Sequence, residues 1–266
     1  MLTALRNFSA SLRYLPGAID YRAIESAYAV RKVWASVGRV LRQRGVVYDV
    51  GRAMGALAVN WRPDYSPALI RRELDIIRTD LHANAVRLGG RDPRRLLAAA
   101  EYAASIGLDV WLGPELWNAT PKRTLRYITE VATAAEPLFR RWPDRLTFCV
   151  GNELSLFMRG IVPGRSHARR SRSPVLRDIV LSGQHALRSF LADAAASVRR
   201  VYGGPSFSFP LAPYSEDPRH DIDATALSIV RTLPRGQHGT TYPDVGWQPK
   251  AAFHALAGYY RQQVSG

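Results

Sequence analysis

The residues best suited to chemistry are Asn152 and Glu153, which directly follow the apolar run Leu146–Val150. A glutamate in a low-dielectric pocket has a raised pKa, stays protonated near neutral pH and can act as a general acid. A neighbouring amide can hold a sugar hydroxyl by hydrogen bonding. Glu153 is therefore a candidate general acid/base and Asn152 a candidate binding residue. The alternative is that Glu153 is a helix-capping or ion-paired carboxylate at an ordinary strand exit.

Chemistry on a glycosidic bond usually needs two carboxyl groups, one to protonate the leaving oxygen and one to act as nucleophile or to activate water. Asp49, Glu115 and Glu216 could supply the second group. Tryptophans could stack on sugar faces, and core packing explains them equally well; those near strand ends are Trp61, Trp111 and Trp117.

Short apolar runs alternate with amphipathic segments from residue 45 to residue 150, which predicts strands that alternate with helices. The predicted strands are Val46–Val50, Ala85–Leu88, Leu108–Leu112, Leu146–Val150 and, further on, Phe207–Leu211. Strands that alternate with helices pair in parallel through right-handed crossovers. The predicted fold class is α/β, a TIM-barrel-like (β/α) repeat with about five parallel strands, fewer than the eight of a closed barrel.

Helix starts are marked by an N-cap residue followed by proline at Ser66-Pro67, Asp92-Pro93 and Thr120-Pro121. The predicted helices are Ala68–Leu81, a segment from Pro93 to Gly107, a segment from Pro121 to about Arg141, about Val175 to Tyr202, and Gln248–Gln263. Ligand sites in such folds gather at the carboxyl ends of the strands. The candidate substrate-binding residues there are Arg87, Glu115, Trp117, Asn152, Trp61 and Glu216.

The chain carries a net charge of +15, and all but three of its 37 basic residues are arginine. A GC-rich coding sequence explains this skew more simply than a polyanion partner does, so nucleic acid is an unlikely partner. An exposed basic loop is nevertheless predicted at Arg159–Arg177, because the segment holds Arg159, Arg165, Arg169, Arg170, Arg172 and Arg177. This loop supports an alternative function, a non-catalytic binding or regulatory module that meets an anionic partner.

Residues 1–44 are predicted to form a basic helical extension, with an amphipathic helix over Tyr21–Arg44, and residues 45–266 the barrel-like domain. Packing on the main domain is favoured over a membrane-surface or partner-binding helix. A signal peptide and a bilayer-spanning stretch are both missing from the sequence, so a cytoplasmic location is expected.

The single cysteine, Cys149, lies in an apolar run and is predicted to be a buried, inert thiol. Zinc-binding, Walker and dinucleotide motifs are absent, so neither a metal nor a cofactor is expected.

Three features in chain order resemble the clan A glycoside hydrolases: Arg87, the pair Trp111 and Glu115, and Val150-Gly151-Asn152-Glu153. These enzymes are (β/α)₈ barrels whose acid/base glutamate follows an asparagine at the end of strand four, so the resemblance implies a carbohydrate ligand and that role for Glu153. A closer resemblance, to actinobacterial barrel proteins often labelled abortive infection proteins, rests on Arg71–Asn84, Gly151–Gly164 and Tyr214–Asp221. That label describes no established chemistry.

The sequence departs from the clan A pattern after Glu153. A retaining enzyme of the clan has its nucleophilic glutamate at the end of strand seven, whereas Glu216 is the only glutamate that follows Glu153 here. We expect that strands five to seven are missing between about residues 203 and 207 and that Phe207–Leu211 corresponds to the last strand. An open sheet edge then results, unless Phe207–Leu211 pairs with the first or the fourth strand or a second chain covers the edge. Catalysis is then impaired unless Glu216, Asp49 or Glu115 replaces the nucleophile.

Overall fold

The computed structural model describes residues 43–51, 53–54, 59–60, 65–176, 185–209, 229–234 and 236–263. The predicted helix Tyr21–Arg44 lies outside these residues except for positions 43 and 44, which are not helical. The boundary between an N-terminal extension and the main domain therefore stays a prediction. Trp61 and Glu216 also lie outside the described residues.

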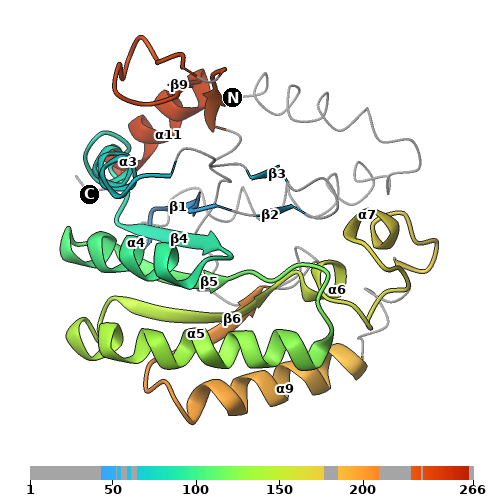
Figure 1. Cartoon of the computed structure of the whole chain (residues 1–266). Helices are drawn as coiled ribbons and strands as arrows, with labels where there is room; N and C mark the ends of the chain where they lie inside the picture. The colour runs from blue at the N-terminus through green and yellow to red at the C-terminus, as the bar shows by residue number, and fades with distance from the viewer. Residues whose placement is uncertain are drawn as a thin grey trace. The chain divides into compact units, whose positions relative to one another are not determined.

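Five parallel strands form one sheet in the described part of the chain, in the order β1-β4-β5-β6-β7 (Figure 1). They are β1 (Gly45–Asp49), β4 (Ala85–Gly90), β5 (Asp109–Pro114), β6 (Leu146–Asn152) and β7 (Ser206–Phe209). All five predicted strands are confirmed, with ends that differ by one or two residues. The first four follow one another across the sheet in chain order, as in a TIM barrel, so the fold is an incomplete TIM-barrel-like α/β fold.

Strand β7 pairs in parallel with β6, the fourth strand of the repeat, and so becomes the fifth strand of the sheet. Pairing with the fourth strand is one of the alternatives that the sequence left open, beside pairing with the first strand and cover by a second chain. The pairing register shifts between Cys149 and Gly151, which is a β-bulge or a similar irregularity. Such irregularities redirect the side chains that follow them. Here the residues that follow are Asn152 and Glu153.

The helices that connect the strands begin where the sequence predicts. They are α3 (Pro67–Thr79), α4 (Pro93–Ser105) and α5 (Pro121–Arg141). Each has its proline at the first helical position, and each cap side chain accepts a backbone hydrogen bond; the one from Leu69 N to Ser66 Oγ measures 3.0 Å. These bonds satisfy amides that have no partner inside the helix.

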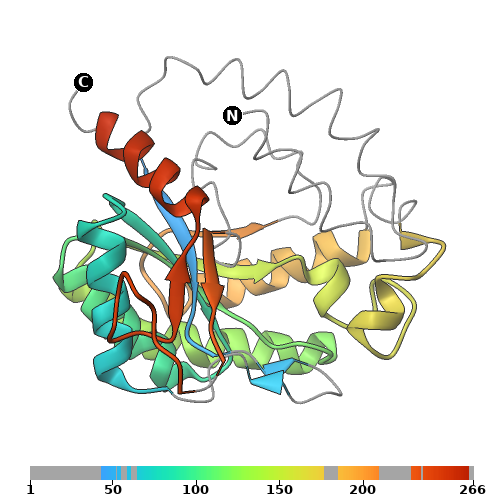
Figure 2. The ribbon, with the colours of Figure 1, turned by 90° about the horizontal axis from the view of Figure 1, so that it is seen from above.

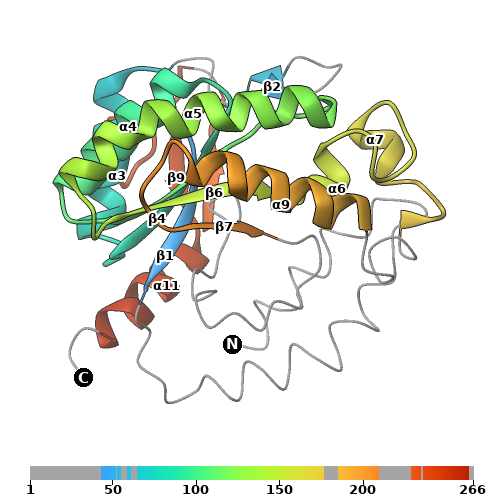
Figure 3. The same ribbon diagram turned by 90° about the horizontal axis from the view of Figure 1, so that it is seen from below.

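The helices lie side by side along the sheet. Within the predicted helix 175–202, helix α9 spans His185–Arg199, Val175 lies in a turn, and residues 177–184 lie outside the described residues. Contacts join α3 to α4, α4 to α5 and α5 to α9, and Figure 3 shows α4, α5 and α9 lying over the sheet. Their apolar faces bury strand residues such as Leu88, Leu112 and Phe148, each at most 1% exposed. Burial of Cys149, also 1% exposed, is confirmed.

The C-terminal region packs beside β1 and α3. It consists of the antiparallel pair β8 (Val230–Thr232) and β9 (Trp247–Pro249), followed by α11 (Ala251–Gln262) (Figure 2). The Tyr260 hydroxyl donates to the carbonyl oxygen of Gly45 at 2.8 Å, which joins α11 to the start of β1. A further short antiparallel pair, β2 (Ala53–Met54) and β3 (Val59–Asn60), follows β1.

A buried carboxylate connects β1, α3 and the C-terminal hairpin. Glu73 on α3 is 3% exposed. It accepts hydrogen bonds from the Tyr48 hydroxyl of β1 and from Trp247 Nε1 of β9, the latter at 2.7 Å. Hydrogen bonds to a charged group contribute more to stability than neutral ones do, so this cluster anchors β9 to the barrel-like sheet.

Replacing Trp247 with phenylalanine removes one of these donors and keeps most of the ring. We expect Trp247→Phe to lower the free energy of unfolding, measured by urea denaturation, by about 1.5–3 kcal/mol. Trp142→Phe is the matched control, because Trp142 Nε1 makes no hydrogen bond with a residue that the structure describes. Equal losses in the two variants would show that the bond to Glu73 contributes nothing.

Candidate functional site

The carboxyl ends of three adjacent strands bring together Arg87, Glu115 and Asn152, three of the predicted site residues. Arg87 in β4 and Glu115, just after β5, form an ion pair with 3.5 Å between Nη2 and Oε1, and their side chains are only 7% and 5% exposed. Asn152 ends the next strand, β6. Removing one member of such a buried pair is costly, because the other charge is left uncompensated. Arg87 therefore compensates the charge of Glu115 and fixes its position.

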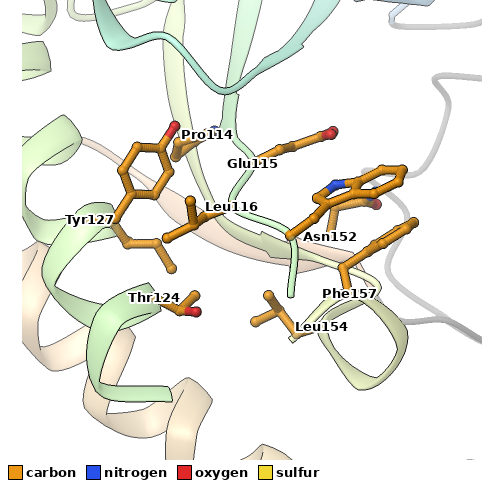
Figure 4. Close-up of a pocket in the computed structure, with 10 residues that line it drawn as sticks. Pro114, Glu115, Leu116, Thr124, Tyr127, Asn152, Leu154 and Phe157 are labelled. Atoms are coloured by element: carbon orange, nitrogen blue, oxygen red, sulfur yellow. The ribbon is translucent and has the colours of Figure 1, made fainter. Parts of the chain in front are cut away.

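A pocket lies beside this ion pair, between β5, β6 and the start of α5 (Figure 4). We call it the strand-end pocket; it is lined by Pro114, Glu115, Leu116, Trp117, Thr124, Tyr127, Ile128, Asn152, Leu154 and Phe157. The empty space among these residues is about 290 Å³, a figure that includes space open to solvent. Three predicted site residues, Glu115, Trp117 and Asn152, thus share one pocket.

Tyr127 adds a hydroxyl group to this pocket. Burial, and secondarily the negative charge of Glu115, raise the pKa of Tyr127 well above its ordinary value, so the phenol remains protonated. The hydroxyl donates to the carbonyl oxygen of Arg91 at 2.8 Å. The helical spacing could have indicated Tyr127, because it is adjacent to the buried stripe of α5, next to Thr124 and Ile128.

Glu153 has a backbone conformation that is rare for a residue with a side chain. Its φ of 46° and ψ of 42° lie in the left-handed region, and it is the N-cap residue of α6 (Leu154–Phe157). That conformation costs about 1–2 kcal/mol for a residue other than glycine. Such strain concentrates at functional sites. Glu153 is half-buried and directly follows a pocket residue, but it is not one of the pocket's lining residues.

The chain bends sharply at this point because Gly151 permits a close approach. A Cβ atom at Gly151 would lie 2.3 Å from Leu154 Cδ1. Leu154 therefore folds back over β6, and α6 follows the strand almost at once. The backbone amides of Leu156 and Phe157 both donate to the carbonyl oxygen of Glu153, at 2.8 and 3.0 Å.

An aromatic cluster forms one wall beside the pocket. The ring centroids of Trp117 and Phe157 lie 4.1 Å apart, and His167, on α7 (His167–Arg170), lies 4.9 Å from Phe157. Burial, and secondarily the nearby Arg170, lower the pKa of His167 below its ordinary value. The imidazole is therefore neutral at pH 7 and packs as an uncharged ring.

Arg170 holds the two loops of this wall together. The prediction that it belongs to an exposed basic loop is wrong, because its side chain is 0% exposed. The guanidinium donates to the carbonyl oxygens of Leu156, Gly164 and Phe157 and, at 2.6 Å, to Oδ1 of Asn118. One side chain thus links the loop after β5 to the segment after β6. Nothing in the local sequence distinguishes Arg170 from the exposed arginines beside it, so its burial could not be predicted.

Of the three remaining predicted residues, Asp49 is described by the structure, whereas Trp61 and Glu216 are not. Asp49 Oδ1 accepts a hydrogen bond from the backbone amide of Gly51 at 2.7 Å. Trp61 and Glu216 lie outside the described residues, so their roles stay predictions.

Within the described ranges, no group of three or more His, Cys, Asp or Glu side chains is placed to hold a metal ion. None of the described helices is long and apolar enough to cross a membrane.

Comparison with protein families and with curated proteins found no match. Among solved structures, the chain is similar to a glycoside hydrolase family 5 enzyme from Prevotella bryantii, with a TM-score of 0.39 and 13% identity. That match covers 70% of this chain and 60% of the enzyme. The fold assignment rests on the strand order rather than on this similarity. Neither the actinobacterial resemblance nor the abortive infection label gains support from the comparisons.

The strain at Glu153 can be measured by comparing glycine with alanine. We expect Glu153→Gly to unfold with a free energy about 1 kcal/mol higher than Glu153→Ala, because only glycine adopts the left-handed region without a Cβ penalty. The matched pair is Glu130→Gly and Glu130→Ala on α5, where glycine should be less stable by about 1 kcal/mol. If alanine is the more stable residue at both positions, Glu153 is not strained.

The contribution of the Arg170 hydrogen bonds to stability can be tested with a substitution that keeps the positive charge. We expect Arg170→Lys to lower the free energy of unfolding by about 3 kcal/mol, because lysine keeps the charge but cannot reach all four acceptors. The exposed neighbour provides the control: Arg169→Lys should change stability by less than about 0.5 kcal/mol. Similar small changes in both variants, measured by urea denaturation, would contradict the account.

Proposed function

We propose that this chain binds a carbohydrate at the carboxyl ends of β5 and β6, in a glycoside-hydrolase-like site where Glu153 is the general acid/base. One observation carries the proposal: Glu115, Trp117 and Asn152 come from neighbouring strand ends and line the same pocket. An aromatic ring offers an apolar surface to the C–H face of a sugar, while amide and carboxylate groups bond to its hydroxyl groups. Pockets of this mixed composition are typical of small-ligand sites.

The role of Glu153 is supported by its place and its backbone. It follows Asn152 at the end of the fourth strand of the repeat, and its left-handed conformation is one that selection rarely retains without a reason. The fold alone would not justify this proposal, because TIM-barrel-like folds carry many functions. The proposal therefore depends on the residues at the strand ends.

We further propose that Glu115 binds substrate rather than acting as a nucleophile. Its carboxylate is paired with Arg87 in a buried site, and a compensated carboxylate held in place suits hydrogen bonding to hydroxyl groups. Hydrolysis would then be slow or absent unless Glu216 contributes the second carboxyl group. The narrower resemblance to the actinobacterial barrel proteins labelled abortive infection proteins stays a prediction and names no substrate.

The proposal is tested with a panel of oligosaccharides in calorimetric titrations and a panel of aryl glycosides in turnover assays. We expect Trp117→Ala and Asn152→Ala each to weaken binding of the best ligand by about tenfold. Glu153→Gln should retain binding and abolish any turnover, since the amide cannot donate the proton.

The control is Glu130→Gln on α5, where the carboxylate side chain is 66% exposed. This variant should match the unmodified chain in both assays. The absence of binding across the panel, or binding that is unchanged by the pocket variants, would refute the proposal.

A further inference from the structure

Six exposed cations surround the aromatic wall of the strand-end pocket. Two of them, Lys122 and Arg123, lie in the first turn of α5. The other four lie in the segment that follows α6. We call the set the basic rim; its members are Lys122, Arg123, Arg159, Arg165, Arg169 and Arg172, all exposed. Arg170, buried between two of them, does not belong to it.

The two segments of the basic rim touch each other. The backbone amide of Arg159 donates to the carbonyl oxygen of Ala119 at 2.9 Å. A Cβ atom at Gly160 would lie 3.5 Å from Cγ of Pro121. Figures 1 and 3 both show α6 and α7 beside the N-terminal end of α5. The backbone segments that carry Lys122, Arg123 and Arg159 thus lie next to each other.

The basic rim adjoins the strand-end pocket. Thr124, directly after Arg123, lines the pocket, and so does Phe157, two residues before Arg159. His167 stacks on Phe157 and precedes Arg169 by two positions. A ligand that occupies the pocket and extends past the aromatic wall would therefore meet the basic rim.

No carboxylate among the residues that the structure describes pairs with the cations of the basic rim. No aspartate or glutamate occurs in residues 116–129 or 154–176. None of the six cations forms an ion pair within the part of the chain that the structure describes. Burial, and secondarily the positive charge of Arg159, lower the pKa of Arg170. Such an uncompensated surface attracts anions.

We infer that the carbohydrate bound in the strand-end pocket is an acidic one, whose carboxylate or sulfate groups bind the basic rim while a sugar ring occupies the pocket. The inference rests on the proposed function and specifies its substrate class. An acidic saccharide is favoured over a nucleic acid, because Trp117 and Asn152 line the pocket and suit an uncharged sugar ring. The Glu115 carboxylate, paired with Arg87, can accept hydrogen bonds from the hydroxyl groups of that ring.

The test compares two triple variants that lose the same charge. The first replaces Arg159, Arg165 and Arg169 with glutamine. The control replaces Arg140, Arg141 and Arg199, which are exposed in the last turns of α5 and α9. Binding of oligogalacturonate, a sulfated heparin oligosaccharide, neutral dextran and single-stranded DNA is measured by calorimetry. The series is run at about 50 mM and about 300 mM NaCl, because salt screens exposed charges.

We expect one acidic saccharide to bind best, to bind more weakly at high salt, and to lose about tenfold in affinity in the rim variant but less than about twofold in the control. Comparison of oligogalacturonate with heparin distinguishes carboxylate from sulfate as the recognised group. The same variant with Trp117→Ala should lose affinity further, since the pocket and the rim bind one ligand.

Three outcomes would overturn the inference. Equal losses in the two triple variants would mean that the net charge of +15 acts as a whole. Tighter binding of DNA than of either acidic saccharide would assign the rim to a nucleic acid. Tight, salt-independent binding of dextran through the pocket would refute the inference and leave the proposed function intact, whereas failure of every saccharide would refute both.

Discussion

Parallel pairing of β4, β5 and β6 is the constraint on which the site depends. Parallel strands run in the same direction, so their carboxyl ends meet at one edge of the sheet although the chain between them is long. Arg87 and Glu115 form a buried ion pair only because β4 and β5 are neighbours. Asn152 reaches the same edge from β6. A shift of register would separate these groups, so the backbone pairing determines the chemistry that is available.

The loops at this edge are ordered by polar contacts more than by regular structure. Arg170 donates hydrogen bonds to carbonyl oxygens of the segment after β6 and to Asn118 Oδ1 in the loop after β5, and it does so from a fully buried position. The aromatic cluster of Trp117, Phe157 and His167 packs against the same loops. The arginines nearby, Arg159, Arg165, Arg169 and Arg172, are exposed, whereas Arg170 is buried and joins the two loops.

Local signals in the sequence predicted most of the fold. Capping residues followed by proline marked the starts of α3, α4 and α5, and apolar runs marked all five strands of the sheet. Contacts between distant residues could not be predicted from local sequence patterns. The strand that pairs with β7 and the burial of Arg170 both depend on how distant segments pack together. The pocket was predicted in part, since Glu115, Trp117 and Asn152 follow strands, whereas Tyr127 lies on a helix.

The central claim is that the strand-end pocket holds a sugar ring with Glu153 at the reacting bond. A crystal structure of the chain with a bound acidic oligosaccharide tests it most directly. The account predicts a ring against Trp117 within hydrogen-bond reach of Asn152, with the Glu153 carboxyl group about 3 Å from a glycosidic oxygen. An oligosaccharide bound away from β5 and β6, with the Glu153 side chain turned from it, would contradict the account.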